Sequence, residues 1–136
     1  MSRYVVLVDG KAGAYGVTVP DLPGCSAMGA TVEEALANTV EAMRDWAEVT
    51  EEVGGAVPVP QAAEALRADP YVAEALGAGA MLATVVMVRE TGRPVKANLS
   101  LDSGVLATLD AEAKRAGLTR SAMVEALTKR MAAGIL

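Results

Sequence analysis

Polar side chains able to hydrogen-bond recur at every second position of a short segment near the C-terminus. Within residues 95–101 these polar positions are Lys96, Asn98 and Ser100. The positions between and around them are apolar, namely Val95, Ala97, Leu99 and Leu101. A period of two places the polar side chains on one face of an extended strand and the apolar ones on the other. An amine, an amide and a hydroxyl in a row can contact base edges in the DNA major groove, which admits a two-stranded ribbon.

A strand at residues 95–101 has no neighbouring strand in the sequence around it. Because an isolated strand needs a partner, we expect it to pair with the same strand of a second copy. The chain would then be a homodimer, with a tetramer as an alternative assembly. The apolar residues expected to form the dimer core come from the strand and from two helices that follow it: Leu99, Leu101, Leu109, Val124 and Leu127.

Two helices are predicted after this strand because their ends carry clear signals. Asp102 or Ser103 can cap a helix that runs to about residue 116, and Gly117 can end it in the left-handed conformation. Thr119 can cap the second helix. The candidate phosphate-binding residues lie at that second N-terminus, where free amide groups, two hydroxyls and a guanidinium come together: Thr119, Arg120 and Ser121.

Residues 95–132 together resemble the ribbon-helix-helix family of DNA-binding proteins of the Arc and MetJ type. The most specific parts are the K-x-N-x-S strand and the G-x-T-R-S step between the helices. The resemblance implies that the three polar strand residues contact bases and that residues 119–121 contact phosphates. The alternative interpretation is an amphipathic strand and helical hairpin with an ordinary solvated face.

Composition limits the class of protein. The chain has 136 residues, 52% of them hydrophobic, and contains no apolar run long enough to cross a membrane. No signal-peptide pattern is found at its start, so we expect a cytoplasmic protein. The single cysteine, Cys25, excludes an internal disulfide framework and has apolar neighbours, so we expect it to be buried and unreactive.

Charge is unevenly distributed along the sequence. Residues 94–136 contain six basic and four acidic side chains, a net charge of +2, whereas residues 1–93 contain six basic and 13 acidic ones, a net charge of −7. A basic tail on an acidic body suits a protein whose tail binds phosphate and whose body binds a cationic partner. The alternative is that the acidic surface only aids solubility.

The N-terminal body is predicted to be an α+β domain of order β-β-β-α-β. The expected strands are residues 3–9, 15–19, 25–28 and 81–88, and the last is an apolar run that suggests burial on both faces. Thr31 and Glu34 form a capping box that opens a helix ending near residues 54–55. Residues 54–80 are expected to be a loop with short helices, one of them begun by Asp69-Pro70. Residues 89–94 would be a linker.

The body resembles the HicB antitoxin family. The matching features are Tyr15-Gly16, the PDLPGC stretch of residues 20–25, Gly29-x-Thr31, and the EEA of residues 33–35. The resemblance implies a partial ribonuclease-H-like fold in residues 1–88. The family varies at its C-terminus, so the prediction of a ribbon-helix-helix domain in residues 95–136 rests on the residues of the tail. The resemblance also implies the antitoxin of a type II pair, which binds a small, basic, RNA-cleaving HicA-type toxin and represses its own operon on double-stranded operator DNA. Toxin contacts are expected in residues 1–88, near residues 20–25.

Catalysis is not expected. Ribonuclease-H chemistry needs several converging carboxylates, but the first strand offers only Asp9 and residues 81–88 contain none. The chain has no histidine, and its GKAGAYG segment lacks the phosphate-loop pattern. We therefore predict no catalytic residue, no metal site and no cofactor.

A second function remains open from the sequence alone. The chain could be a stand-alone ribbon-helix-helix transcriptional regulator whose N-terminal domain senses a ligand or oligomerises. A short basic reading frame beside this one, carrying a histidine, would favour the antitoxin. Its absence would favour the regulator.

Overall fold

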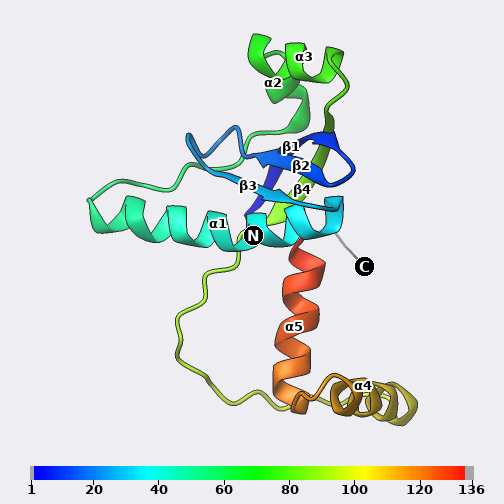
Figure 1. The fold of residues 1–136 in the computed structure, drawn as a ribbon. Helices are drawn as coiled ribbons and strands as arrows, with labels where there is room; N and C mark the ends of the chain where they lie inside the picture. The colour runs from blue at the N-terminus through cyan, green and yellow to red at the C-terminus, as the bar shows by residue number, and fades with distance from the viewer. Residues whose placement is uncertain (1, 134–136) are drawn as a thin grey trace.

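The computed structural model describes residues 2–133 as an antiparallel sheet with helices on both of its faces and a helical tail (Figure 1). The strands are β1 (Arg3–Lys11), β2 (Ala14–Thr18), β3 (Ser26–Gly29) and β4 (Met81–Val86). The helices are α1 (Val32–Glu52), α2 (Ala63–Arg67), α3 (Pro70–Gly77), α4 (Ser103–Arg115) and α5 (Arg120–Ala132). This mixed architecture confirms the predicted α+β class.

The sheet has the strand order β3-β2-β1-β4, and every neighbouring pair is antiparallel. Its central strand β1 is buried on both faces, with Tyr4, Val6 and Val8 on one face and Val5 and Leu7 on the other. The first set belongs to the main core, which also contains the buried face of α1. Figure 1 shows α1 along one side of the sheet and α2 and α3 on the opposite side.

The prediction that the apolar run 81–88 is buried on both faces is wrong. β4 ends at Val86 and lies at an edge of the sheet, where only Val85 is fully buried and Met81 is 47% exposed. A strand buried on both faces is typical of the middle of a sheet, and here β1 occupies that position. The short helices α2 and α3 reverse the chain direction, so that β4 returns antiparallel to β1.

Glycines and capping residues set the ends of the body's elements. Gly29 ends β3 so close to α1 that a Cβ there would lie 2.4 Å from the backbone nitrogen of Ala35. The next turn begins α1, where the Thr31 hydroxyl accepts a hydrogen bond from the Glu34 amide, as the capping signal predicted. Asp69 caps α3 in the same way, and Pro70 is its first residue.

Side-chain hydrogen bonds hold the segment between α1 and α2, residues 53–62, against β1 and the loop after β2. The Tyr4 hydroxyl donates to the Pro58 carbonyl. The buried Asp21 carboxylate accepts from the Gln61 backbone amide at 3.0 Å and from its side-chain amide at 2.6 Å. These bonds link the segment to β1 and to the loop after β2.

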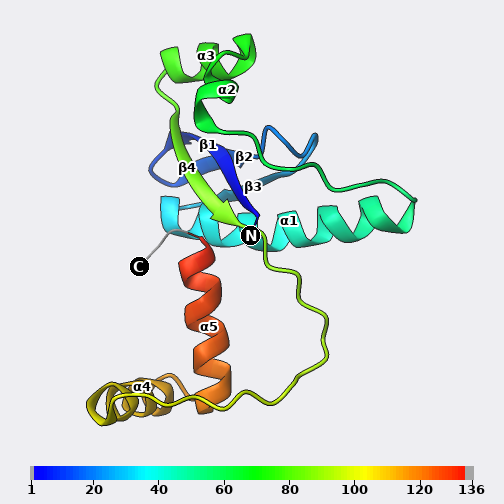
Figure 2. The same ribbon diagram turned by 180° about the vertical axis from the view of Figure 1, so that it is seen from behind.

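The tail leaves the body and then returns to it. Residues 87–102 belong to no helix or strand and swing away from the sheet (Figure 2). They lead to α4, from which α5 runs back so that its last turn meets α1. Ala132 and Ala133 are buried there within the main core. The body's core is therefore completed by residues from the end of the tail.

Candidate functional site

The predicted base-contacting segment is fully exposed in the single chain. Lys96, Asn98 and Ser100 all lie on the surface, and so do the apolar residues between them, with Leu99 66% exposed and Leu101 43% exposed. Within residues 2–133, no strand pairs with this segment. The strand at residues 95–101 thus remains a prediction, because its hydrogen bonds require a second chain.

The helical hairpin of α4 and α5 has an apolar face that the single chain covers incompletely. Leu109, Val124 and Leu127 are half-buried, whereas Val105 is 59% exposed. A groove of about 600 Å³ lies between the two helices and is lined in part by Val105, Leu109, Met123 and Leu127. Two of the predicted dimer-core residues, Leu109 and Leu127, therefore lie in this groove, whereas Val124 lines a separate pocket beside residues 90–94.

The predicted signals at the start of α5 are present in the structure. Gly117 has φ of 72°, in the left-handed region that favours glycine after a helix. The Thr119 hydroxyl accepts a hydrogen bond from the Ala122 amide at 3.1 Å and so caps α5. Ser121 is exposed in the first turn.

Arg120, a predicted phosphate contact, is held by a residue that the sequence did not indicate. Its Nε and Nη2 atoms donate to the two carboxylate oxygens of Asp110, each at 2.8 Å. The hydrogen bond from Arg120 lowers the pKa of Asp110 below its usual value. The pair joins α4 to α5 across the turn. A phosphate that binds Arg120 must therefore share or displace Asp110.

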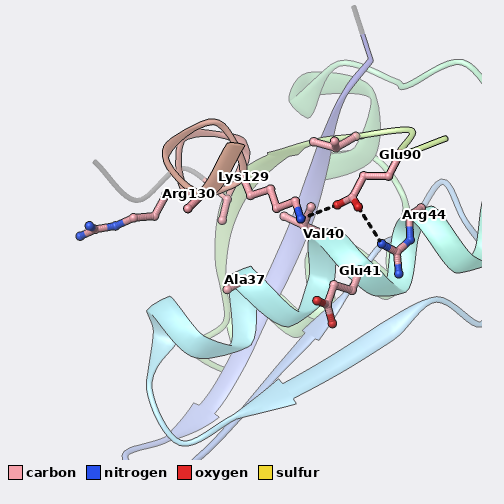
Figure 3. Close-up of a pocket in the computed structure, with 10 residues that line it drawn as sticks. Ala37, Val40, Glu41, Arg44, Glu90, Lys129 and Arg130 are labelled. Atoms are coloured by element: carbon pink, nitrogen blue, oxygen red, sulfur yellow. Dashed lines mark ion pairs between the residues drawn. The ribbon is translucent and has the colours of Figure 1, made fainter. Parts of the chain in front are cut away.

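The last turn of α5 packs against α1 around a pocket of about 300 Å³ (Figure 3). Its apolar wall comes from Ala37 and Val40 of α1 and from Ala126 and Ala133 of the tail. Small side chains on both helices allow this close approach. This contact places the tail helix on the body.

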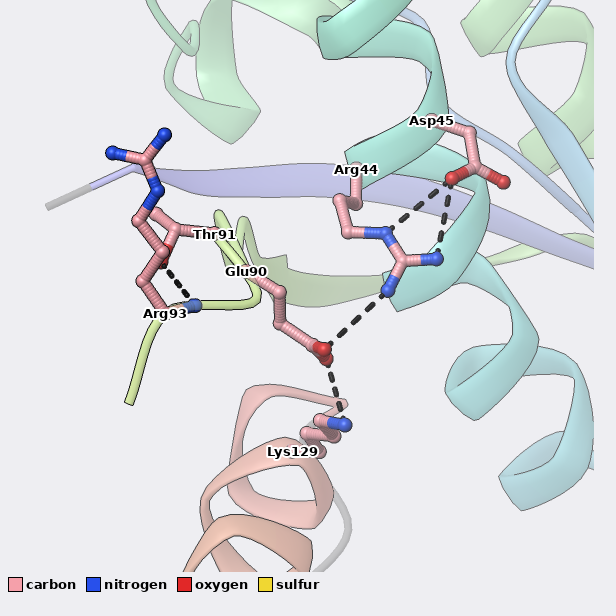
Figure 4. A network of polar contacts seen from close by, with 6 residues as sticks. All are labelled: Arg44, Asp45, Glu90, Thr91, Arg93 and Lys129. Atoms are coloured by element: carbon pink, nitrogen blue, oxygen red, sulfur yellow. Dashed lines mark hydrogen bonds and ion pairs between the residues drawn. The ribbon is translucent and has the colours of Figure 1, made fainter. Parts of the chain in front are cut away.

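A chain of ion pairs lies beside the pocket and was also missed by the sequence analysis (Figure 4). Glu90 accepts from Lys129 of α5 at 2.7 Å and faces the Arg44 guanidinium at 3.6 Å. Arg44 in turn pairs with Asp45 at 3.2 Å. The hydrogen bond from Lys129 lowers the pKa of Glu90. The neighbouring Arg89 pairs with Glu51 of α1, so the first residues of the predicted linker are tied to the body.

The PDLPGC loop of residues 20–25 is anchored against α1. Leu22 and Cys25 are buried, and the Trp46 indole of α1 donates a hydrogen bond to the Pro23 carbonyl at 2.9 Å. Asn38, two turns earlier on α1, donates to the carbonyl of Met28 in β3 at 2.8 Å. Burial raises the pKa of the Cys25 thiol to about 11, which agrees with the predicted buried and unreactive cysteine.

Acidic side chains do not converge in the body. Within residues 2–133, no group of three or more histidine, cysteine, aspartate or glutamate side chains is arranged to hold a metal ion. Across the same residues, no helix is both long enough and apolar enough to cross a membrane.

Comparisons with known proteins place the chain in a family. A model of the family described as "HicB_like antitoxin of bacterial toxin-antitoxin system" matches residues 4–128. The crystal structure of the Burkholderia pseudomallei antitoxin HicB is 32% identical, with a TM-score of 0.54, and the match covers 95% of this chain and 97% of that one.

Two further relatives match parts of the chain. The UPF0150 protein Ta0767 of Thermoplasma acidophilum is 38% identical over 64 residues, which are 47% of this chain and 93% of that protein. A HicA3–HicB3 toxin–antitoxin complex contains a chain that is 23% identical, with a TM-score of 0.53 over 63% of this chain and 98% of that one, a likeness of fold. Since the family match spans nearly the whole sequence, this chain belongs to the HicB-like antitoxin family of bacterial toxin–antitoxin systems.

Proposed function

We propose that this antitoxin neutralises a small, basic, RNA-cleaving toxin by direct binding and represses its own operon as a ribbon-helix-helix dimer. The observation that carries the proposal is the family match over residues 4–128, which includes both the body and most of the tail. One solved structure with the same fold is a complex of a HicA toxin with a HicB antitoxin. A toxin of that class is therefore the proposed partner.

The two activities are assigned to different surfaces because the charges differ. The body up to residue 93 carries a net charge of −7 and suits a partner that exposes positive charge for RNA. The tail carries a net charge of +2 and exposes the alternating polar segment 95–101. Inhibition would follow from occupation of the toxin's RNA-binding surface rather than from any chemical step.

Operator binding is assigned to a dimer in which two copies of residues 95–101 pair. In this arrangement Lys96, Asn98 and Ser100 would face base edges, and Thr119, Arg120 and Ser121 would contact phosphates. The apolar side chains Leu99 and Leu101 would close over the half-buried residues of α4 and α5. Support comes from the exposure of these side chains in one chain and from the incomplete cover of the hairpin groove.

The assignment is tested with point variants of the full chain, because Ala132 and Ala133 complete the body's core and a truncation would remove them. The toxin is co-expressed with the double variant Lys96→Ala/Asn98→Ala while growth and an operator-driven reporter are followed. We expect full rescue of growth together with loss of repression. Lys114→Ala, an exposed basic change on α4, is the matched control and should preserve both activities.

Two results would contradict the proposal. If the wild-type antitoxin did not rescue growth, the toxin-neutralising role would be wrong. If the double variant rescued growth and still repressed the reporter, the assignment of base contacts to residues 95–101 would be wrong.

A further inference from the structure

Helix α1 carries a second apolar stripe besides the one that it buries. The buried side consists of Leu36, Val40, Met43 and Ala47. The second stripe follows i, i+4, i+7 and i+11 spacing, which places its members on one face of the helix: Ala42, Trp46, Val49 and Val53. Within it, Val49 is 60% exposed and Val53, the residue that ends the helix, is 80% exposed. Ala42 and Trp46 are half-buried against the core. Two exposed valines beside a half-buried tryptophan make a contiguous apolar patch that suits an interaction surface.

This stripe forms one wall of a groove of about 320 Å³, which we name the Trp46 groove. Residues 24–26 form the opposite wall, and Ala42, Asp45, Trp46, Val49 and Thr50 line it from α1. The hydrogen bond from the Trp46 indole to Pro23 fixes the ring against the loop. A fixed, half-buried tryptophan offers a large contact area with little loss of side-chain entropy on binding.

An acidic stripe runs beside the apolar one. Each of its members precedes an apolar residue by one position and is exposed: Glu41, Asp45, Glu48 and Glu52. Asp45 pairs with Arg44. Among residues 2–133, no ion pair is formed by Glu41, Glu48 or Glu52. The groove thus has an apolar centre with a negatively charged border on its α1 side.

The negative charge along the groove indicates which class of molecule could bind there. A second copy of the same surface would bring like charges together, which opposes association. A protein with an apolar contact residue surrounded by lysine or arginine side chains would match both the centre and the border. Nucleic acid is disfavoured because its phosphates would face the carboxylates of Glu41, Glu48 and Glu52.

We propose that the Trp46 groove and its acidic stripe form the docking surface for a basic protein. Resting on the function proposed above, this partner is the RNA-cleaving toxin. Apolar contacts with Trp46 and Val49 would slow dissociation, whereas the acidic stripe would speed association. The groove and its acidic stripe use residues 24–53, whereas the predicted DNA contacts use residues 95–101 and 119–121, so the two partners have separate binding residues.

The test measures binding of a catalytically inactive form of the operon's HicA-type toxin to the full-length antitoxin by surface plasmon resonance. Val49→Asp should raise Kd about tenfold or more, mainly through faster dissociation. Val59→Asp is the matched control, since Val59 is 84% exposed and lies outside the groove. It should change Kd by less than about threefold.

A second pair of variants tests the acidic stripe and does not depend on the fold around Val49. Glu48→Gln/Glu52→Gln should lower the association rate about threefold to tenfold at low salt and reduce its salt dependence. Glu64→Gln/Glu74→Gln removes the same charge from exposed positions of α2 and α3 and should have a smaller effect.

The outcomes separate this inference from the proposed function. If wild-type protein binds the toxin but neither groove variant differs from its control, the docking surface is elsewhere and the antitoxin function stands. If the groove variants bind more weakly than their controls, the surface is supported. If wild-type protein does not bind the toxin at all, both proposals are overturned.

Discussion

The body and the tail both contain segments in which apolar residues alternate along the chain. In the body these apolar side chains are buried by the rest of the same chain, whereas in the tail they are exposed. In β1, Tyr4, Val6 and Val8 are each no more than 2% exposed. In the tail, Leu99 and Leu101 are 66% and 43% exposed, and no strand in the described part of the chain pairs with their segment. The body's core, which includes Ala132 and Ala133 at the end of the tail, is thus closed within one chain. Pairing of residues 95–101 should instead depend on dimerisation and on protein concentration.

The largest expected effect comes from placing a charge in the predicted dimer core. Leu99→Asp should abolish dimerisation and operator binding, because the carboxylate would be buried without a partner in the paired ribbon. Sedimentation should show monomers at micromolar concentration. A folded dimer of this variant would rule out pairing through residues 95–101.

A cavity in the core of the body should lower the stability of the body without changing dimerisation, unlike a charge in the predicted dimer core. Met43 is fully buried in the main core. Met43→Ala should lower the free energy of unfolding of the body by about 2–5 kcal/mol, since the removed side chain leaves a cavity. Trp46 fluorescence in urea measures this, and the midpoint should be the same at two protein concentrations. A concentration-dependent midpoint would mean that the body also depends on the dimer.

The sequence predicted those features of the fold that depend on interactions between residues close together in the chain. Capping residues and C-terminal glycines interact only with residues a few positions away in the sequence, so their effect can be predicted locally. In the structure, Thr31, Asp69 and Thr119 cap the helices that they were predicted to begin, and Gly117 follows the helix that it was predicted to end. The apolar run at β4 was misplaced because hydrophobicity alone does not distinguish a central strand from an edge strand.

The parts that could not be predicted depend on distant contacts. Glu90 meets Lys129 from 39 positions away in the sequence, and Asp110 of α4 meets Arg120 of α5 across the turn between the two helices, so no local pattern marks either pair. The exposed stripe at Val49 is readable as a spacing, but its exposure follows from how α1 lies on the sheet. The strand at residues 95–101 depends on a second chain.

DNA binding should separate base contacts from phosphate contacts within the tail. Asn98→Ala should weaken operator binding by about 1–3 kcal/mol and leave nonspecific binding nearly unchanged. Arg120→Ala should weaken both and lower the slope of log K against log salt by about one. Fluorescence anisotropy on operator and random duplexes at several salt concentrations distinguishes them. Identical behaviour of the two variants on both duplexes would show that the roles are assigned incorrectly.

The smallest expected effect concerns Asp110, which holds Arg120 in the single chain. Asp110→Asn should strengthen nonspecific DNA binding a few-fold at low salt, because the guanidinium no longer divides its hydrogen bonds between a carboxylate and a phosphate. Removing a negative charge alone would also raise affinity, so the same change is made in an Arg120→Ala background, where the gain should be smaller.

The pH dependence adds a check on this last comparison. The hydrogen bond from Arg120 lowers the pKa of Asp110 in the folded state. The contribution of this ion pair to folding stability is therefore present above the pKa that Asp110 has in the unfolded chain, and it is lost as the pH falls through the pKa of the folded state. Between pH 6 and 8 the gain from Asp110→Asn should therefore be constant. An equal gain in both backgrounds would mean that Asp110 acts only through its charge and does not compete with phosphate for Arg120.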